Sequence, residues 1–105
     1  MEKLKVIWSE ASLDDLDQIY FHISKDSKKV ASNIIKNIVD YSENVTLFPK
    51  SGRVIPLIKI EKYRETFIES FRLMYKVEEK QITILGVVHM SMDFNLEEFR
   101  KRVKD

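Results

Sequence analysis

The sequence predicts a small α+β domain in which a pair of helices packs on an antiparallel sheet. Apolar residues recur at helical spacing through residues 10–45, and four short segments rich in β-branched and aromatic residues follow within residues 53–90. The chain has 105 residues, of which 44% are hydrophobic, and this suits one domain with one modest core. Residues 1–105 are therefore interpreted as a single domain with the element order β-α-α-β-β-β-β-α.

The N-terminal part predicts a strand followed by a helical hairpin. Residues 3–8 alternate in polarity and end in β-branched and aromatic side chains, which favours a short strand. Ser9 and Ser12 are both suitable N-caps for the first helix, and Asp15 follows Ser12 at the spacing of a capping box. A link of two residues, ending at the possible cap Ser27, separates the two helical patterns, so the helices are expected to pair antiparallel.

Residues 53–90 show the residue pattern of strands and not that of helices. Four segments separated by two to four residues are expected to form antiparallel strands, at residues 53–60, 63–68, 72–78 and 81–90. Within the third segment Tyr75 alternates with apolar neighbours and is expected in the core.

The last residues predict a short helix. Residues 95–105 place apolar side chains at helical spacing, with Asn95 as a possible cap. The basic cluster of residues 100–104 in this segment is interpreted as a solvated helix face that also suits the helix dipole.

Composition excludes several kinds of site. The chain has no cysteine, which rules out disulfides, thiolate catalysis and cysteine-based zinc sites. The two histidines, His22 and His89, lie far apart in the sequence, so we expect no metal and no cofactor, and His22 is expected on the surface of a helix. No apolar run approaches the roughly 20 residues of a membrane span, and the N-terminus lacks the pattern of a signal peptide. A cytoplasmic protein that does not act at a membrane is expected.

Positive charge is concentrated in one stretch of the chain. The formal net charge is only +1, which is low for a protein dedicated to binding nucleic acid. Residues 50–76, however, carry seven basic and three acidic side chains, for a net charge of +4, whereas residues 1–49 sum to −2 and residues 77–105 to −1. Arg72 and Lys76 are expected on one half-exposed face of a strand, with Met74 between them.

The basic segment and the end of the last strand are the places where chemistry is expected. A metal-free site that cleaves RNA needs a base, an acid and cations around the phosphate, and His89, Glu65, Tyr75, Arg72 and Arg64 could supply them. Structural roles stay open beside this one. Glu65 is also expected to pair with a nearby arginine on the sheet surface, Arg64 is one such partner, and Arg72 suits either a ligand contact or a structural ion pair.

The order and spacing of several motifs resemble the RelE/ParE toxin superfamily of type II toxin–antitoxin modules, from about residue 3 to residue 94. The motifs are Val-Ile-Trp-Ser-Glu-Ala at 6–11, Leu-Phe-Pro-Lys-Ser-Gly-Arg at 47–53, Tyr-Arg-Glu at 63–65, Phe-Arg-Leu-Met-Tyr-Lys-Val at 71–77 and Ile-Leu-Gly-Val-Val-His at 84–89. The resemblance implies the family fold, and it implies either a ribosome-dependent mRNA endonuclease of the RelE type or an inhibitor of DNA gyrase of the ParE type.

The resemblance favours the ParE branch. Ribonuclease members have a glutamate where this chain has Ile55 and a His-Tyr pair where it has Met90-Ser91, although the arginine matching Arg72 is kept. The strand that ends at His89 and is followed by Asp93 is similar to ParE members, with Met92 in place of their arginine. A toxin that inhibits gyrase and is not an enzyme is the first expectation, a ribosome-dependent endonuclease is the alternative, and a degenerate, non-toxic binding module is the third.

All three expectations include a cognate antitoxin, and the alternatives for the target are DNA gyrase or the ribosome with mRNA. The resemblance further implies plasmid stabilization and growth inhibition as the biological role, and a homodimer or a heterotetramer with the antitoxin as the assembly. An acidic, partly disordered antitoxin segment is expected to cover residues 50–76. Residues expected to bind the target or the antitoxin are Arg53, Arg64, Arg72, Lys76, His89, Met90, Met92 and Asp93.

Overall fold

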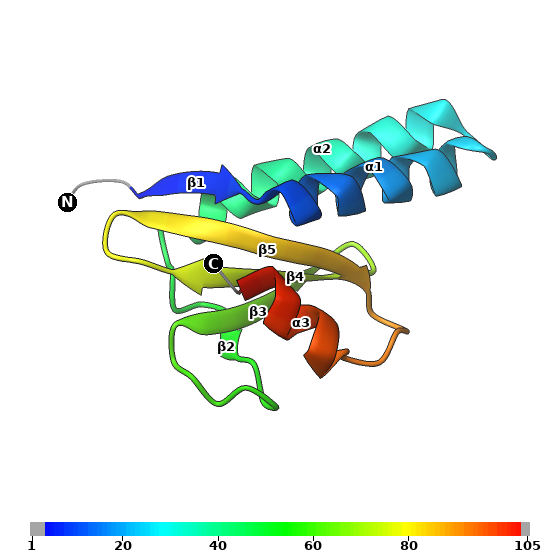
Figure 1. The fold of residues 1–105 in the computed structure, drawn as a ribbon. Coiled ribbons are helices and arrows are strands. Elements are labelled where there is room, and N and C mark those ends of the chain that lie inside the picture. Colours follow the sequence, from blue (N-terminus) through cyan, green and yellow to red (C-terminus); the bar gives the residue numbers. More distant parts are fainter. Residues whose placement is uncertain (1–3, 104–105) are drawn as a thin grey trace.

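The fold is that of an α+β domain, as predicted, and is described here for residues 4–103 of a computed structural model (Figure 1). A helical hairpin lies along one side of a five-stranded sheet, and a short C-terminal helix lies on the other side. The elements in chain order are β1 (Lys5–Trp8), α1 (Glu10–Ser24), α2 (Lys28–Val45), β2 (Arg53–Val54), β3 (Tyr63–Ile68), β4 (Phe71–Val77), β5 (Gln81–His89) and α3 (Leu96–Val103).

The helical hairpin follows the sequence prediction, and Ser9 is the first cap of the two candidates, Ser9 and Ser12. The Ser27 side chain accepts a hydrogen bond from the Val30 N–H and so caps α2 as expected. Ser9 caps α1 by accepting from the Ser12 N–H, and Ser12 is a buried residue inside the helix. The predicted capping box from Ser12 to Asp15 is therefore wrong, because Ser9 starts the helix three residues earlier and leaves Asp15 free for another role.

The sheet has the order β1-β5-β4-β3-β2 and is mixed. The pairs β2–β3, β3–β4 and β4–β5 are antiparallel, as predicted from the short connections between them. β1 runs parallel to β5, with Lys5 opposite Gln81 and Trp8 opposite Ile84. The parallel pair arises because the whole helical hairpin separates β1 from the later strands, so no tight turn fixes its direction.

The predicted strand over residues 53–60 is wrong beyond Val54. The chain leaves the sheet at Ile55, whose carbonyl accepts hydrogen bonds from the N–H groups of Ile58 and Lys59 and so closes a turn. Pro56 has no N–H for a strand ladder, and Lys59 takes a left-handed φ of 58°. Ile55 is only 1% exposed, so burial of its side chain fixes the turn against the core.

Each face of the sheet has its own core. Leu73, Tyr75 and Ile84 pack under the helical hairpin, so the predicted core position of Tyr75 is confirmed. On the opposite face, Met74 and Phe99 pack together with the buried residues Ile55, Tyr63 and Leu85. This second core attaches α3 and the segment between β2 and β3 to the sheet. This layer buries Met74, whereas Arg72 and Lys76 on the same face are half-buried, in agreement with the half-exposed face predicted for them.

One edge of β5 loses its neighbouring strand halfway along. β1 pairs with β5 only as far as Ile84, and a register shift in the β4–β5 pair follows at Met74/Tyr75. Beyond this point the Asp15 carboxylate of α1 accepts a hydrogen bond from the Val87 N–H at 2.9 Å. Arg102 of α3 donates to the Leu85 carbonyl, also at 2.9 Å. Two side chains thus take the place of the missing strand.

Asp15 and Arg102 also bind each other. Arg102 Nη1 lies 2.6 Å from Asp15 Oδ2, Arg102 Nη2 lies 3.0 Å from Oδ1, and both side chains are largely buried. The hydrogen bonds that Arg102 donates to the Asp15 carboxylate raise the pKa of its guanidinium, so this pair stays ionic. The prediction that residues 100–104 form a solvated basic face is wrong for Arg102, because this residue joins α3 to α1 and β5. The predicted helix is confirmed over residues 96–103, and residues 104–105 lie outside the described range.

Replacing Arg102 should destabilise the fold far more than replacing its exposed neighbour Arg100. Arg102→Ala leaves the Asp15 carboxylate and the Leu85 carbonyl without their shared partner, and we expect a loss of about 3 kcal/mol in the free energy of unfolding. Arg100→Ala removes an exposed arginine from the same helix and should change it by less than about 0.5 kcal/mol. Urea unfolding of the two variants measures both values, and equal losses would contradict this role of Arg102.

Candidate functional site

A buried ion cluster connects three of the sequence-predicted site residues. Arg53 and Glu65 stand directly opposite each other in the β2–β3 register, and Arg53 Nε lies 2.7 Å from Glu65 Oε2. Arg72 on β4 reaches the same carboxylate, with its Nε 3.4 Å from Oε1. The Glu65 side chain is 1% exposed, that of Arg72 is 17% exposed and that of Arg53 is 59% exposed. Glu65 was expected to pair with arginine on an exposed sheet surface; the pairing is confirmed and the exposure is wrong.

Aromatic rings and apolar side chains surround this Arg53–Glu65–Arg72 cluster. The guanidinium of Arg72 lies 6.0 Å from the ring centroids of both Phe67 and Phe94, and that of Arg53 lies 5.7 Å from Phe67. Glu65 Oε1 and Arg72 Nε have no hydrogen-bond partner of good geometry. A small cleft of about 190 Å³ opens beside them, against Phe94 and the segment that follows β2. The cluster carries a net charge of +1, most of it accessible at Arg53.

Arg64 and Lys76 turn away from this cluster. Arg64 Nη1 donates to the Gly52 carbonyl at 2.9 Å, and its Nη2 lies 3.5 Å from Glu61, so the side chain holds the loop before β2. Lys76, at the far end of β4, lies 3.5 Å from Glu78. Of the four basic residues predicted to bind a partner, the structure therefore brings only Arg53 and Arg72 together.

Tyr75 fixes the same loop from the other face of the sheet. Its hydroxyl accepts from the Gly52 N–H at 3.0 Å and donates to the Pro49 carbonyl at 2.8 Å. A Cβ at Gly52 would lie 2.5 Å from this hydroxyl, so glycine is required for the close approach. Burial raises the pKa of Tyr75 above its ordinary value of 10.0, so the phenol stays protonated and serves the fold at neutral pH.

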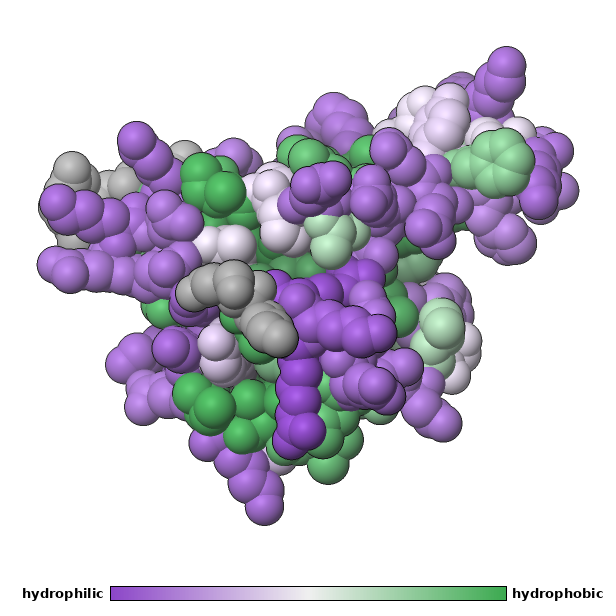
Figure 2. Space-filling model, in the orientation of Figure 1, coloured by the Kyte–Doolittle hydropathy of each residue, from purple (hydrophilic) through white to green (hydrophobic). Residues whose placement is uncertain are grey.

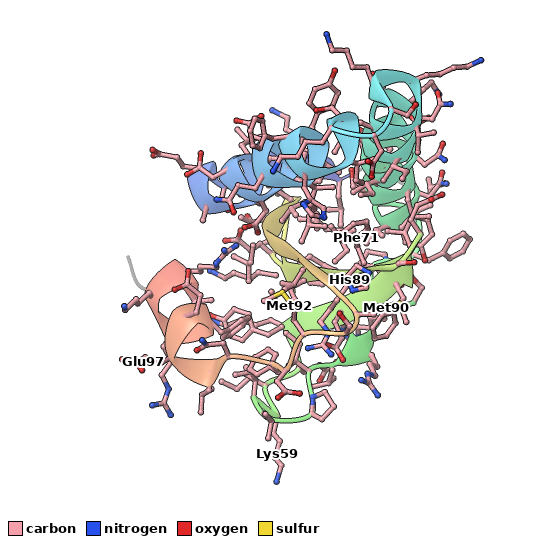
Figure 3. All side chains as sticks on the ribbon, turned by 90° about the vertical axis from the view of Figure 1, so that its right-hand side faces the viewer. Lys59, Phe71, His89, Met90, Met92 and Glu97 are labelled. Carbon is pink, nitrogen blue, oxygen red and sulfur yellow. The ribbon has the colours of Figure 1, made fainter. Side chains whose placement is uncertain are left out.

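A wide groove lies next to the cluster, between α1, the end of β5 and α3. We call it the β5 groove; its volume is about 750 Å³, within the range of pockets that bind ligands. Figure 3 looks toward this side of the molecule, where Phe71, His89 and Met92 lie between the helical hairpin and α3. Arg72 lines both this groove and the smaller cleft, so the two are neighbours. The β5 groove and the cluster together form the candidate site.

His89 stands exposed at the mouth of the β5 groove. Its Nδ1 accepts a hydrogen bond from the Ser91 N–H at 3.1 Å and lies 2.7 Å from the Ser91 hydroxyl. The ring packs edge-on against Phe71, with 5.4 Å between the ring centroids. Because Nδ1 is an acceptor here, the neutral ring carries its hydrogen on Nε2, which is the nitrogen available to a ligand.

The segment after β5 forms the rim of the groove. Met90 and Met92 are 49% and 59% exposed, and Asp93 is exposed beside them. Met92 and Asp93 line the groove, whereas Met90 does not. Exposed methionines of this kind suit a surface that packs against a protein partner, because the flexible thioether adapts to the shape of its neighbour.

The arrangement is suited to binding. The carboxylate of the cluster, Glu65, is buried between two guanidiniums, and Ile55 fills a core position where the family resemblance places a glutamate in ribonucleases. Within residues 4–103 there is no group of three or more histidine, cysteine, aspartate or glutamate side chains placed to hold a metal ion. The helices of this described part are too short or too polar to cross a membrane. An accessible cation, an apolar groove and methionines remain as contact surfaces.

Sequence reasoning missed the Asp15–Arg102 pair, which forms one wall of the β5 groove. The two residues are separated by 87 positions, and each had a local explanation in the helix that contains it. A single sequence holds no signal that would join them. The register shift in the β4–β5 pair places the strand edge beside Asp15 and Arg102, and the residue pattern does not predict this shift either.

One family model matches most of the chain. Residues 6–94 match the family described as the ParE toxin of the type II toxin–antitoxin system parDE. No curated protein sequence matches the chain.

Two solved structures have a similar fold. A chain of the chromosomal ParDE toxin–antitoxin system from P. aeruginosa superposes with a TM-score of 0.69 and 22% identity, covering 83% of this chain and 96% of that one. The YoeB dimer from Staphylococcus aureus gives a TM-score of 0.55 and 16% identity, covering 84% and 98%. At these identities the likeness establishes the fold alone.

Removing the buried carboxylate of the Arg53–Glu65–Arg72 cluster should be strongly destabilising. Glu65→Ala leaves the largely buried Arg72 without its partner, and we expect a loss of about 3 kcal/mol in the free energy of unfolding. Glu61→Ala is the matched control, because Glu61 also pairs with two cations yet is 71% exposed, and its loss should stay below about 1 kcal/mol. Chemical denaturation checks both values; a small effect of Glu65→Ala would show that the cluster is dispensable for the fold.

Proposed function

Because the chain belongs to the ParE toxin family of type II toxin–antitoxin systems, we propose that it inhibits DNA gyrase in the cytoplasm and is neutralised by a cognate antitoxin. The family match over residues 6–94 carries this proposal. The candidate site supports inhibition by binding, since an accessible arginine, an apolar groove and an exposed methionine segment are all contact surfaces. Growth inhibition and plasmid stabilization are the consequences that we expect in the cell.

The electrostatics of the cluster support a role without catalysis. A general base must reach the proton that it removes and must be free to accept it. Glu65 is buried, and both of its oxygens face guanidinium groups, so neither is open to a substrate. Tyr75 is buried under the helical hairpin and hydrogen-bonded to the backbone, so it is equally withdrawn from a substrate.

A ribosome-dependent mRNA endonuclease is the second candidate. The observation in its favour is that Arg72 and His89 line the same groove, which would place a cation and an imidazole near one phosphate. His89 presents Nε2 to this space, since Nδ1 is engaged by Ser91. This candidate uses Arg72 as the phosphate contact and His89 as the acid, with Glu65 acting only through Arg72.

A non-toxic binding module is the third candidate. Its motivation is Met92, which is 59% exposed at the position where the resemblance implies an arginine. If contact with gyrase needs that cation, the chain would retain the antitoxin-binding surface without the activity. Induction of the protein in cells without the antitoxin tests this candidate, because growth arrest would exclude it.

The antitoxin contact follows the distribution of charge. Residues 50–76 carry the net positive charge of the chain, and Arg53 presents most of the accessible charge of the buried cluster. An acidic stretch of the antitoxin covering this region would gain from the charge and from the neighbouring hydrophobic surface. Figure 2 shows hydrophobic surface over the segment between β2 and β3, in which Leu57 and Ile60 are exposed.

Purified protein should inhibit the supercoiling reaction of DNA gyrase and trap a cleavage complex. The expected result is loss of supercoiled product and appearance of linear DNA after denaturation of the complex, with both effects relieved by the antitoxin. Normal supercoiling and no trapped complex, in the presence of an active control inhibitor, would overturn the gyrase proposal.

Primer extension on mRNA from induced cells separates the first two candidates. The gyrase proposal predicts no cuts linked to codon position. Codon-linked cuts that disappear in Arg72→Ala would instead support the endonuclease and replace the first candidate with the second.

Reversal of the charge at Arg53 should weaken antitoxin binding. Arg53→Glu places a negative charge against the acidic antitoxin stretch, and we expect the dissociation constant to rise about tenfold at low salt. Lys36→Glu, on an exposed turn of α2 outside residues 50–76, is the matched control and should stay within about twofold. Titration calorimetry at two salt concentrations measures both, and equal affinities would contradict an acidic contact at Arg53.

A further inference from the structure

The β5 groove contains a stretch of unpaired strand edge. In the β4–β5 ladder the Met90 N–H points to β4, where it donates to the Ser70 carbonyl, whereas the Val87 N–H points away from β4, to Asp15. Backbone groups alternate in direction along a strand, so the N–H and C=O groups of Val87 and His89 all face the groove. Figure 1 shows why this edge is open, since the helical hairpin diverges from β5 toward the His89 end.

Two of these four groups are already occupied. Asp15 accepts the Val87 N–H, and the His89 carbonyl accepts from the Met92 N–H at 3.0 Å. The Val87 carbonyl and the His89 N–H have no partner among residues 4–103. They are the groups left for a ligand.

The free Val87 carbonyl and His89 N–H determine the direction in which a further strand could pair with β5. In a parallel ladder, one residue bonds to two residues of the neighbouring strand. Its N–H donates to the carbonyl of the first, and its carbonyl accepts from the N–H of the residue two positions later on that neighbouring strand. The Val87 carbonyl and the His89 N–H have this relation. An antiparallel ladder would instead need both groups of Val87 or both groups of His89, and each of these residues already uses one. The free pair therefore continues the parallel β1–β5 ladder, which ends at Ile84.

The charge of the groove indicates the chemistry of the occupant. Its lining has carboxylates at Asp15, Glu69, Asp93 and Glu98, against guanidinium groups at Arg72 and Arg102. Arg72 is further neutralised by Glu65 outside the groove, which leaves the groove negative. Apolar walls are supplied by Ile19, Ile23 and Phe71 among others. A segment with apolar and basic side chains fits this lining.

We propose that an extended, apolar and basic segment of the cognate antitoxin docks in the β5 groove as a strand parallel to β5. One of its residues donates its N–H to the Val87 carbonyl and accepts from the His89 N–H through its own carbonyl. This inference rests on the proposed neutralisation by an antitoxin and deepens it. The segment is distinct from the acidic stretch proposed to contact Arg53, because Arg53 lies outside the groove lining and presents positive charge, whereas the groove is negative.

His89→Pro tests the strand contact, with His89→Ala as the matched control. Proline removes the N–H that the fold itself does not use, at an edge position where proline is tolerated, and both variants remove the imidazole ring. The probe is the purified antitoxin encoded by the adjacent reading frame. We expect His89→Pro to bind it about tenfold more weakly than His89→Ala, with thermal unfolding of both variants confirming the fold. Equal affinities of two folded variants would overturn the strand contact.

Asp93→Lys tests the charge of the occupant without altering the strand, so it applies even if His89→Pro fails to fold. Asp93 lines the groove, whereas Glu97, labelled in Figure 3, is exposed on α3 outside the lining. Asp93→Lys should weaken antitoxin binding about fivefold or more, while Glu97→Lys should leave it unchanged. Equal or stronger binding by Asp93→Lys would overturn the basic occupant. No binding by the unaltered chain would overturn the proposed neutralisation, a result distinguishable from failure of the strand contact alone.

Discussion

The ion pair between Asp15 and Arg102 is the interaction on which the rest of this structure depends. It joins the first helix, the last helix and β5 at the point where β5 loses its neighbouring strand β1. Without it, the Leu85 carbonyl and the Val87 N–H would lose the side-chain partners that replace the missing strand, which is costly for backbone groups of buried residues. The pair keeps α3 on the sheet, so it also sets the walls of the β5 groove.

A division of charge between neighbouring surfaces connects this architecture to function. The accessible positive charge of the basic segment lies at Arg53, because the single carboxylate of Glu65 is shared between Arg53 and Arg72. The groove beside it is lined by more acidic than basic side chains. A partner that covers both must present acidic and basic stretches in a fixed order. This suits a long, flexible protein segment better than a nucleic acid, whose phosphates would meet the acidic groove. The near-neutral net charge of the chain is therefore the sum of a basic surface at Arg53 and an acidic surface in the β5 groove.

Much of the fold could be predicted from the sequence because local rules decide it. Ser27 caps α2, a two-residue link fixes the helical hairpin, and the alternation around Tyr75 identifies the core face of β4. The features that the sequence did not predict depend on contacts between residues far apart in the chain. Glu65 is buried because α3 and the turn at Pro56 cover its face of the sheet, and no periodicity within β3 reports that cover. The Arg53–Glu65 pair follows from strand register, whereas Asp15 and Arg102 meet only through tertiary packing.

Residue-resolved amide hydrogen exchange tests the central claim, that side chains close half of the β5 edge and leave the other half open for a partner strand. We expect slow exchange at the Val87 amide, which Asp15 holds, and fast exchange at the His89 amide in the free protein. On addition of the antitoxin, the His89 amide should become as slow as that of Val87. Fast exchange at Val87, or a His89 amide that exchanges equally fast in the free and bound protein, would contradict a β5 edge that is closed at Val87 and open at His89.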